Sequence, residues 1–275
     1  MELPKISCVC LTNKRPVLLL RAINCFNAQS YENKELVIVY LKTDTATIEA
    51  LDTISAANIK QVEVDSVVRP TIGELRNISI EAATGDYFCQ WDDDDWYHSH
   101  RLKYQYEAMM NCHKEANVLE NWLMFDDVNK QVYLSFKGPW AASILCKKSL
   151  FDQDIKYPHL NKHEDRVFLG KLFNINCLYP SIAPFLYIYV YHGKNTWDQK
   201  HFNFLFKNSL RLSPDISKLV ADILNEHIDN DTASRLLQSK DVLKEVDYFY
   251  HFSNSAKGAY VHPIRRFIKA FIRQA

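Results

Sequence analysis

The sequence predicts an α/β protein with a mostly parallel central sheet flanked by helices, followed by a helical C-terminal extension. Three short apolar runs, each followed by a segment with helical spacing of apolar residues, precede a fourth run that is rich in aromatics. Repeated strand–helix order of this kind builds parallel sheets that are covered by helices. Ligands bind such sheets at the carboxyl ends of the strands, and the fourth run passes directly into four aspartates. The sequence therefore predicts the fold class and the sheet edge at which chemistry takes place.

The composition excludes several classes of protein. The chain has 275 residues, is 47% hydrophobic, and carries 33 basic against 33 acidic side chains. This length suits one large domain or one and a half ordinary ones, and zero net charge argues against a general nucleic-acid binder. Seven cysteines without a C-x-x-C pair indicate reduced thiols. The start MELPKIS lacks the basic and apolar regions of a signal peptide, and no apolar stretch reaches membrane-spanning length, so we expect a cytoplasmic protein.

The first half of the chain alternates between apolar runs typical of strands and segments whose apolar residues have helical spacing. ISCVCL is an apolar run suited to a buried parallel strand, Pro16 suits the first position of a helix, and Leu19, Ile23 and Phe26 follow at helical spacing. The expected elements are strand Ile6–Leu11, helix Pro16–Ala28, strand Glu35–Leu41, helix Thr47–Ala57, strand Val62–Val68, helix Thr71–Ala83 and the strand that begins after Asp86.

The second half gives weaker signals. Ser99 is expected to cap a helix that runs to Met110, and Asn161 and Glu164 have the spacing of a capping box. The remaining expected elements are strands Val118–Phe125, Gln131–Phe136 and Ser143–Cys146, a helix through Phe173, strand Leu186–Val190, and helices from His201 to the end.

The segment Tyr87–Tyr97, YFCQWDDDDWY, combines an apolar strand with four consecutive carboxylates. If the strand continued through them, alternation would place Asp92 and Asp94 on one face, about 7 Å apart, and Asp93 and Asp95 on the other. Like charges this close raise each other's pKa unless a cation neutralises them. The segment therefore predicts a divalent-cation site, with a solvated acidic turn as the alternative.

Five stretches in this order resemble the family 2 glycosyltransferases, and the resemblance covers about residues 4 to 200. It implies a nucleotide-sugar-binding fold of type A and transfer with inversion. The stretches are ISCVCLTNKRP (Ile6–Pro16), AQSYENKELVIV (Ala28–Val39), GELRNISIEAATGDYFCQWDDDDW (Gly73–Trp96), KHEDRVF (Lys162–Phe168) and YHGKNTW (Tyr191–Trp197).

In that family a D-x-D motif after the fourth strand binds the metal that holds the nucleotide diphosphate, and Asp92-Asp93-Asp94 matches it. The resemblance implies Asp94 as the direct ligand of Mn²⁺ or Mg²⁺, and Asp92 as a partner of the ribose or of a metal-bound water. Such hard cations prefer oxygen ligands. Asp93 and Asp95 have weaker claims, because facing the other way one of them would pair with Arg76 or cap the next turn.

The resemblance also implies a catalytic base and a further metal ligand. Glu164-Asp165 matches an acidic pair whose aspartate takes the proton of the acceptor hydroxyl. The alternative is that both acids only complement the helix dipole. His192 resembles a histidine that some members supply as a third metal contact, and its alternative is a hydrogen-bonded histidine at a strand end.

Other residues match the donor-binding parts of the family. Thr12, Asn13 and Arg15 follow the first strand, where the family contacts the nucleotide, and Arg76 and Asn77 match an element near the diphosphate. An arginine suits phosphate recognition, although a salt bridge on the helix surface would explain Arg76 as well.

One departure concerns the nucleobase. Many members end the second strand with Asp-Asp-Gly-Ser, whereas this chain has Tyr40-Leu41-Lys42-Thr43-Asp44, so Asp44 is the remaining candidate to read the base. A UDP-sugar is then the default donor only by analogy. Trp140 is expected either to stack on a sugar face or to fill the core.

The resemblance, together with the acidic segment, implies a metal-dependent inverting glycosyltransferase with no nucleic-acid partner. By analogy with the family, the expected setting is surface polysaccharide or glycolipid biosynthesis, with a glycan or lipid-linked acceptor. The expected domains are a catalytic domain at 1–205, divided into nucleotide-binding (1–98) and acceptor (99–205) halves, and a helical extension at 206–275. The alternatives are a metal-dependent phosphohydrolase or nucleotidyltransferase, and a non-catalytic nucleotide-sugar-binding module.

The tail Val261–Ile272, VHPIRRFIKAFI, has the pattern of a basic amphipathic helix. Such a helix lies in a membrane interface, which would place the protein on the inner face of the membrane as a peripheral protein. The alternative is a terminal helix that packs its apolar stripe on the domain.

Overall fold

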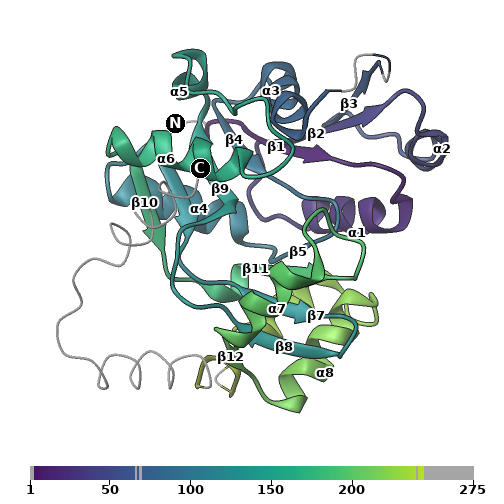
Figure 1. Cartoon of the computed structure of the whole chain (residues 1–275), viewed down its shortest axis with the longest axis vertical. Helices are drawn as coiled ribbons and strands as arrows, with labels where there is room; N and C mark the ends of the chain where they lie inside the picture. The colour runs from purple at the N-terminus through teal and green to yellow at the C-terminus, as the bar shows by residue number, and fades with distance from the viewer. Residues whose placement is uncertain (1–2, 66, 68–69, 240, 245–275) are drawn as a thin grey trace. The chain divides into compact units, whose positions relative to one another are not determined.

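The computed structural model describes residues 3–65, 67, 70–239 and 241–244, which form two compact units (Figure 1). The first unit runs to Val118 and resumes at Ala141–Ser181, and the second comprises Leu119–Trp140 and the chain from Ile182 onward. None of the helices in this part of the chain has the length and apolarity that crossing a bilayer requires.

Seven strands form the sheet of the first unit, in the spatial order β10-β6-β9-β4-β1-β2-β3. β1 pairs in parallel with β2 and β4, β2 pairs in parallel with β3, and β9 is antiparallel to β4. The expected parallel arrangement of the first four strands is therefore confirmed, and β9 makes the sheet mixed. The strands are β1 (Ile6–Leu11), β2 (Lys34–Leu41), β3 (Ile59–Val64), β4 (Tyr87–Gln90), β6 (Ala116–Leu119), β9 (Trp140–Lys147) and β10 (Leu178–Ser181).

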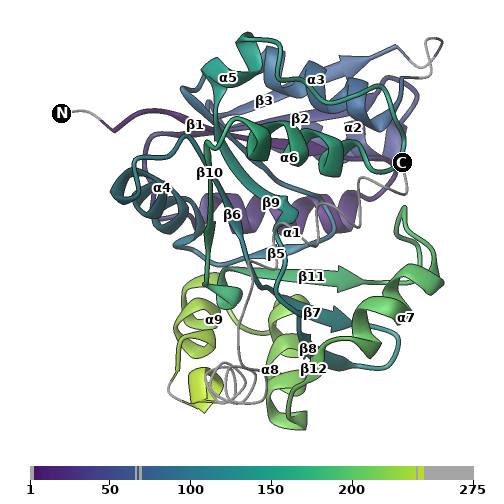
Figure 2. The same cartoon turned by 60° about the vertical axis from the view of Figure 1, so that its left-hand side comes forward.

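Helices cover both faces of this sheet, with α3 and α6 on one side and α1 and α4 on the other (Figure 2). Their starts follow from local chemistry: Pro16 opens α1, the Asp44 side chain caps α2, and Thr71 and Glu74 form a complete capping box at α3. The helices are α1 (Pro16–Asn27), α2 (Thr45–Asp52), α3 (Ile72–Ala82), α4 (Arg101–Asn111), α5 (Lys148–Asp152) and α6 (Glu164–Asn174).

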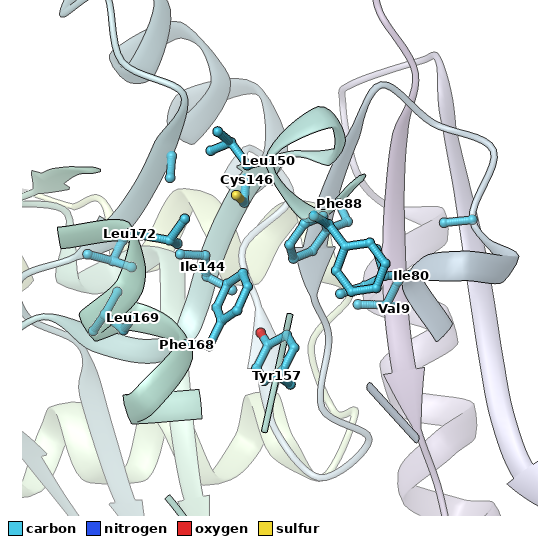
Figure 3. Close-up of a cluster of buried hydrophobic side chains, with 14 of the residues drawn as sticks. Val9, Ile80, Phe88, Ile144, Cys146, Leu150, Tyr157, Phe168, Leu169 and Leu172 are labelled. Carbon is cyan, nitrogen blue, oxygen red and sulfur yellow. The ribbon is translucent and has the colours of Figure 1, made fainter. Parts of the chain in front are cut away.

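The core between the sheet and α3, α5 and α6 is apolar and densely aromatic (Figure 3). Val9 and Phe88 from β1 and β4 contribute to it, as do Ile80 of α3 and Phe168 of α6. Each of these side chains is at most 4% exposed. Burial of a side chain of this size stabilises a fold by about 1.5–3 kcal/mol, so this core fixes both helices against the strands whose ends carry the acids.

The strands of the second unit follow the spatial order β12-β8-β7-β11. β7 is parallel to β11 and antiparallel to β8, which is antiparallel to β12. Trp122 stacks on Tyr189, and Tyr189 stacks on Phe202 of α7, with ring centroids 4.8 and 5.4 Å apart. The elements are β7 (Leu123–Asp126), β8 (Gln131–Leu134), η2 (Pro184–Leu186), β11 (Tyr187–Tyr191), α7 (Gln199–Lys207), β12 (Leu210–Arg211), α8 (Pro214–Leu224) and α9 (Asn230–Leu237).

Several element boundaries differ from the expectations. The helix expected to end at Ala57 ends at Asp52, and the third strand is Ile59–Val64. The single strand expected at Val118–Phe125 is two strands, β6 and β7, in different sheets. β12 interrupts the expected helices after His201.

The expected helix caps are also wrong in two places. His100, and not Ser99, precedes α4, and it makes no capping hydrogen bond. Asn161 does not cap α6, because its Oδ1 accepts from the amide of Ile72 at the start of α3, 3.1 Å away. The functional boundary near residue 205 stays a prediction, and the expected tail helix at Val261–Ile272 lies outside the described residues.

Candidate active site

The four aspartates do not continue the strand. β4 ends at Gln90, and Asp92–Asp95 form a turn that leads into β5 (Trp96–Tyr97). The rings of Trp91 and Tyr97, whose centroids are 3.9 Å apart, bring the two ends of the turn together. The expected alternation of carboxylates on two faces is therefore wrong, since the backbone is not extended here.

Buried donors fix the backbone of this turn. Tyr97 donates its hydroxyl to the carbonyl of Asp92 at 2.9 Å, and Arg21 of α1 donates to the carbonyl of Asp94 at 2.7 Å. The guanidinium of Arg101, which is fully buried, lies over the rings of Tyr97 and Trp91 at 4.6 and 5.2 Å. Side chains of α1, β5 and α4 thus hold the acidic turn together.

Two of the acids share Arg15, which lies in the loop after β1. Its Nη1 is 2.8 Å from Asp94 Oδ2 and 3.2 Å from Asp93 Oδ1. Thr12 donates its hydroxyl to Asp93 at 2.8 Å, while Asn13 is exposed in the same loop. Burial, followed by the neighbouring charge of Asp94, raises the pKa of Asp93 to about 7. The charge of this carboxylate is therefore only partly compensated.

Arg76 of α3 joins the acidic turn to α6. Its Nη1 is 3.4 Å from Asp92 Oδ1, and its Nε is 3.1 Å from Glu164 Oε1. The expected pairing of Arg76 with Asp93 or Asp95 is wrong, because the turn directs Asp92 toward α3. Burial opposes the charge of Arg76, but Asp92 and Glu164 outweigh it and raise the pKa of the guanidinium. The interpretation of Arg76 as a helix-surface salt bridge fails, since the residue is 9% exposed.

Asp165 lies beside this ion-pair network. Burial, and then the adjacent charge of Glu164, raises the pKa of Asp165 to about 6, and Arg76 acts in the opposite direction. Oδ1 of Asp165 accepts the amide hydrogen of Arg166 at 2.6 Å. A carboxylate with a raised pKa is a better proton acceptor than an ordinary aspartate and is still ionised at neutral pH.

Asp44 and Asn77 form the following hydrogen bonds with residues outside the acidic turn. The carboxylate of Asp44 accepts from the amide and hydroxyl of Thr47 and from the amide of Lys14, at 3.1, 2.6 and 2.5 Å. Asn77 exchanges two hydrogen bonds with the backbone of Tyr157, at 2.9 and 3.0 Å. Their roles in substrate binding stay predictions.

His192 and Trp140 belong to the second unit. His192 follows β11, and its Nδ1 accepts the amide of Lys194 at 3.3 Å, which places the ring proton of the neutral imidazole on Nε2. Trp140 stacks on Trp122 at 4.7 Å and contacts Phe136. The contacts of Trp140 are thus those of an aromatic cluster, and the sugar-stacking and metal-ligand roles remain predictions.

The charges around the turn favour a bound cation. Five carboxylates gather around the guanidinium groups of Arg15 and Arg76, namely those of Asp92, Asp93, Asp94, Glu164 and Asp165. Among the described residues, no three His, Cys, Asp or Glu side chains are placed so that they could hold a metal ion as they stand. The donor set is composed of oxygen and fits a hard divalent cation, provided that Arg15 gives up part of its contact.

Two residues of this region, Gln90 and Tyr157, are not expected from the sequence. Gln90 is the last residue of β4 and donates from Nε2 to Asp92 at 3.1 Å. Tyr157 lies in an irregular segment before α6, where no periodicity marks it, and donates its hydroxyl to Gln90 at 3.3 Å. The position of Gln90 directly before the acids is the one signal that could have indicated it.

Comparison with solved structures identifies the fold. The mannosyltransferase PcManGT of Pyrobaculum calidifontis, solved with GDP-Man and Mn²⁺, has a TM-score of 0.55 and 14% identity over 97% of this chain and 83% of its own. S. aureus TarS has a TM-score of 0.54 and 16% identity over 90% of this chain and 78% of its own, and TarS was also solved with UDP and with UDP-GlcNAc. The chain has the type A fold of nucleotide-sugar glycosyltransferases.

Sequence comparison gives the family. The model of Glycosyl transferase family 2 matches residues 7–164. The amylovoran biosynthesis glycosyltransferase AmsB of Erwinia amylovora is 31% identical over 31% of this chain and 29% of its own length. An uncharacterized glycosyltransferase of Haemophilus influenzae is 31% identical over 41% of this chain and 45% of its own. The chain belongs to glycosyltransferase family 2. It spans less than half the length of these curated relatives.

Proposed function

We propose that this glycosyltransferase moves one sugar from a nucleotide-diphosphate donor to an acceptor hydroxyl, with inversion at the anomeric carbon and with Mn²⁺ or Mg²⁺. The observation that carries the proposal is the surplus of carboxylates after the carboxyl end of β4 and at the start of α6. A diphosphate adds negative charge to this surplus, so a divalent cation is needed to bring the two together.

Asp94 is the proposed metal ligand, with Asp92 bonded to the ribose or to a metal-bound water, and His192 as a further candidate ligand. The cation, when bound, would act as a Lewis acid that neutralises charge on the departing diphosphate. Arg15, Thr12 and Asn13 are proposed to contact the nucleotide. Arg15 already bonds the same carboxylates and would be displaced toward phosphate oxygens.

Asp165 is the proposed base. The acceptor oxygen forms a bond to the anomeric carbon as the bond to the diphosphate oxygen breaks, and the hydroxyl proton passes to the Asp165 carboxylate. The base must be ionised, so the rate should rise as the pH rises through about 6, the raised pKa of Asp165. Glu164 would hold Arg76 in place and keep it between the base and Asp92.

The identity of the nucleobase is proposed only by analogy. TarS was solved with UDP-GlcNAc, whereas PcManGT was solved with GDP-Man. In this chain the carboxylate of Asp44 is occupied by Thr47 and Lys14, which leaves it poorly placed to accept from a base. A UDP-sugar is the default donor, and a glycan or lipid-linked acceptor in surface polysaccharide or glycolipid assembly is the proposed setting.

The decisive experiment separates binding from chemistry by comparing Asp165→Asn with Asp94→Asn. Asp165→Asn should bind the donor almost normally but transfer sugar at least about a hundredfold more slowly, which is the usual scale for loss of a general base. Asp94→Asn should lose metal-dependent donor binding. Calorimetry with a panel of UDP-, GDP-, ADP- and dTDP-sugars and Mn²⁺, together with a nucleotide-release assay, measures both effects.

Two outcomes would contradict the proposal. Full activity of Asp94→Asn in EDTA would remove the metal from the mechanism. Tight nucleotide binding by the wild type without turnover of any donor would instead support a non-catalytic binding module. Asp127→Asn is a suitable control, because the exposed Asp127 forms a surface ion pair with Lys130.

A further inference from the structure

Tyr157 is a buried aromatic residue that contacts two parts of the candidate active site, the acidic turn through Gln90 and the helix α6 through Phe168. It is 3% exposed, and its ring lies parallel to that of Phe168, with 4.1 Å between the centroids and 9° between the planes (Figure 3). Phe168 is on α6, three residues after Asp165, and i,i+3 positions share one side of a helix. The ring of Tyr157 therefore supports the helix that carries the proposed base.

The hydroxyl of Tyr157 is linked to Asp92 of the acidic turn through Gln90. It donates to Gln90 Oε1 at 3.3 Å, and Gln90 Nε2 donates to Asp92 Oδ2 at 3.1 Å. An amide has one accepting end and one donating end, so acceptance from Tyr157 directs the NH₂ group of Gln90 toward Asp92. Burial also raises the pKa of Tyr157 well above its ordinary value, which keeps the phenol a donor.

Two further contacts fix Tyr157 itself. Asn77 of α3 accepts from its amide and donates to its carbonyl, at 3.0 and 2.9 Å. The guanidinium of Arg76, one residue earlier on α3, lies 5.8 Å from the centre of its ring. The same arginine bonds Asp92 and Glu164, so Tyr157 is fixed to the groups that it supports.

We propose that Tyr157 is a positioning residue for the transfer reaction, which orients Asp92 through Gln90 and holds the helix of Asp165 through Phe168. The inference rests on the proposed function, because it assigns these carboxylates to donor binding and to proton transfer. Tyr157 touches neither substrate in this proposal. Its hydroxyl serves the donor half of the site, and its ring serves the base.

The test removes the hydroxyl and keeps the ring. Tyr157→Phe should raise the KM for the donor about fivefold and leave kcat within about twofold, since one neutral hydrogen bond contributes about 1 kcal/mol. Tyr31→Phe is the matched control, because Tyr31 is 2% exposed and its hydroxyl donates to the carbonyl of Pro4 at 2.6 Å. The control should leave both constants unchanged in the nucleotide-release assay with the donor panel and Mn²⁺.

A double-mutant cycle with Gln90→Met distinguishes this role from general support of the fold. If the hydroxyl acts through Gln90, Gln90→Met alone should raise the donor KM by a similar factor, and adding Tyr157→Phe should raise it no further. A purely structural effect of the hydroxyl would multiply with that of Gln90→Met. The single variant Gln90→Met also keeps the proposal testable if Tyr157→Phe does not fold.

The outcomes separate this inference from the proposed function. A wild type that turns over none of the donors would overturn the proposed function, and the positioning role with it. An active wild type with Tyr157→Phe equal to Tyr31→Phe would overturn this inference alone. A lower kcat with unchanged KM in Tyr157→Phe would also overturn it, because the hydroxyl would then serve the base.

Discussion

Asp93 carries a charge that its surroundings compensate only in part. It is 3% exposed, and burial together with Asp94 raises its pKa to about 7 despite the contacts with Arg15 and Thr12. A carboxyl whose pKa is higher in the folded protein than in the unfolded chain lowers the free energy of unfolding as the pH rises from its unfolded pKa through its folded pKa. Ionised Asp93 is therefore a cost that the site bears at neutral and alkaline pH.

Replacing Asp93 by Asn should relieve this cost at high pH. Asparagine still accepts a hydrogen bond but carries no charge, so the Tm of Asp93→Asn relative to the wild type should be more favourable at pH 8 than at pH 5. Differential scanning fluorimetry at the two pH values measures the difference. The control Asp127→Asn removes an exposed carboxylate and should show no such pH dependence; an equal Tm difference at both pH values for Asp93→Asn would contradict the assignment.

At the scale of single residues, the sequence indicates the acids but not their partners. The types and order of Asp92–Asp95 are enough to predict an acidic site, whereas the base at Asp165 is implied by the resemblance and stays a prediction. The sharing of Arg15 by two aspartates depends on the turn between Trp91 and Tyr97, and residue alternation predicts the opposite arrangement. Tyr157 could not be predicted, because its contacts come from distant parts of the chain.

Among the helices of the first unit, α3 approaches the segment before α6 closely. The amide of Gly73 donates to the carbonyl of Leu160 at 3.0 Å, and a Cβ at Gly73 would overlap the carbonyl oxygen of Pro158. Only glycine allows this approach. The helix that carries Arg76 is thereby held against the segment that leads to Glu164 and Asp165.

A pair of glycine substitutions tests this contact. Gly73→Ala should destabilise the protein by about 1–3 kcal/mol, the usual cost of overpacking, and should lower activity because α3 and the 157–161 segment must separate. Gly170→Ala is the matched control, since nothing lies within 4 Å of its added Cβ and it is inside α6. The control should stabilise the protein by about 0.5–1 kcal/mol. Urea denaturation monitored by fluorescence measures both; equal effects would show that the approach at Gly73 is relaxed in solution.

At the scale of elements, periodicity predicts the strands and helices that have strong local signals. Pro16 marks a helix start that the structure confirms, and the helix expected from Thr71 to Ala83 is observed as α3. The capping box of Thr71 and Glu74 at its start is not among the sequence-based expectations. The run 118–125 is expected to be one strand, because an apolar run does not show where the chain passes from one sheet to another. Asn161 bonds α3 and not α6 because the amide of Ile72 lies within its reach.

For the whole molecule, strand–helix order is sufficient to predict the parallel strands β1 to β4, whereas the antiparallel strand β9 and the second unit depend on long-range pairing that local patterns do not encode. Strand pairing over long separations is fixed by tertiary packing. The resemblance supplies the family, and the match over residues 7–164 confirms it.

Membrane contact through the tail is a prediction for the whole chain. A helix over Val261–Ile272, as the sequence predicts, would place Ile264 and Phe267 on an apolar stripe and Arg265 and Arg266 on the other face. We expect truncation after residue 255 to abolish sedimentation with anionic vesicles, because each cation near anionic lipid contributes about 1 kcal/mol to binding. If the tail does not pack on the domain, the same truncation should not lower the Tm. The full-length chain with Arg265→Gln and Arg266→Gln should bind such vesicles more weakly.

The opposite pattern would assign the tail to the domain. A truncated protein with a lower Tm, together with a full-length protein that ignores vesicles, would show that the apolar stripe packs on the rest of the chain. Vesicles of neutral lipid provide the control for binding that does not depend on charge.

The order of strands in the first sheet also limits how much of this sheet can form while the chain is still being synthesised. β6 is made before β9, yet β9 lies between β6 and β4 in the sheet. When synthesis has reached residue 139, β1, β2, β3 and β4 have been made. The two strands that pair with β6 in the sheet, β9 and β10, have not yet been made. The apolar strand Ala116–Leu119 therefore stays unpaired until Trp140–Lys147 has left the exit tunnel. The helix α6, which carries the proposed base, is synthesised later still.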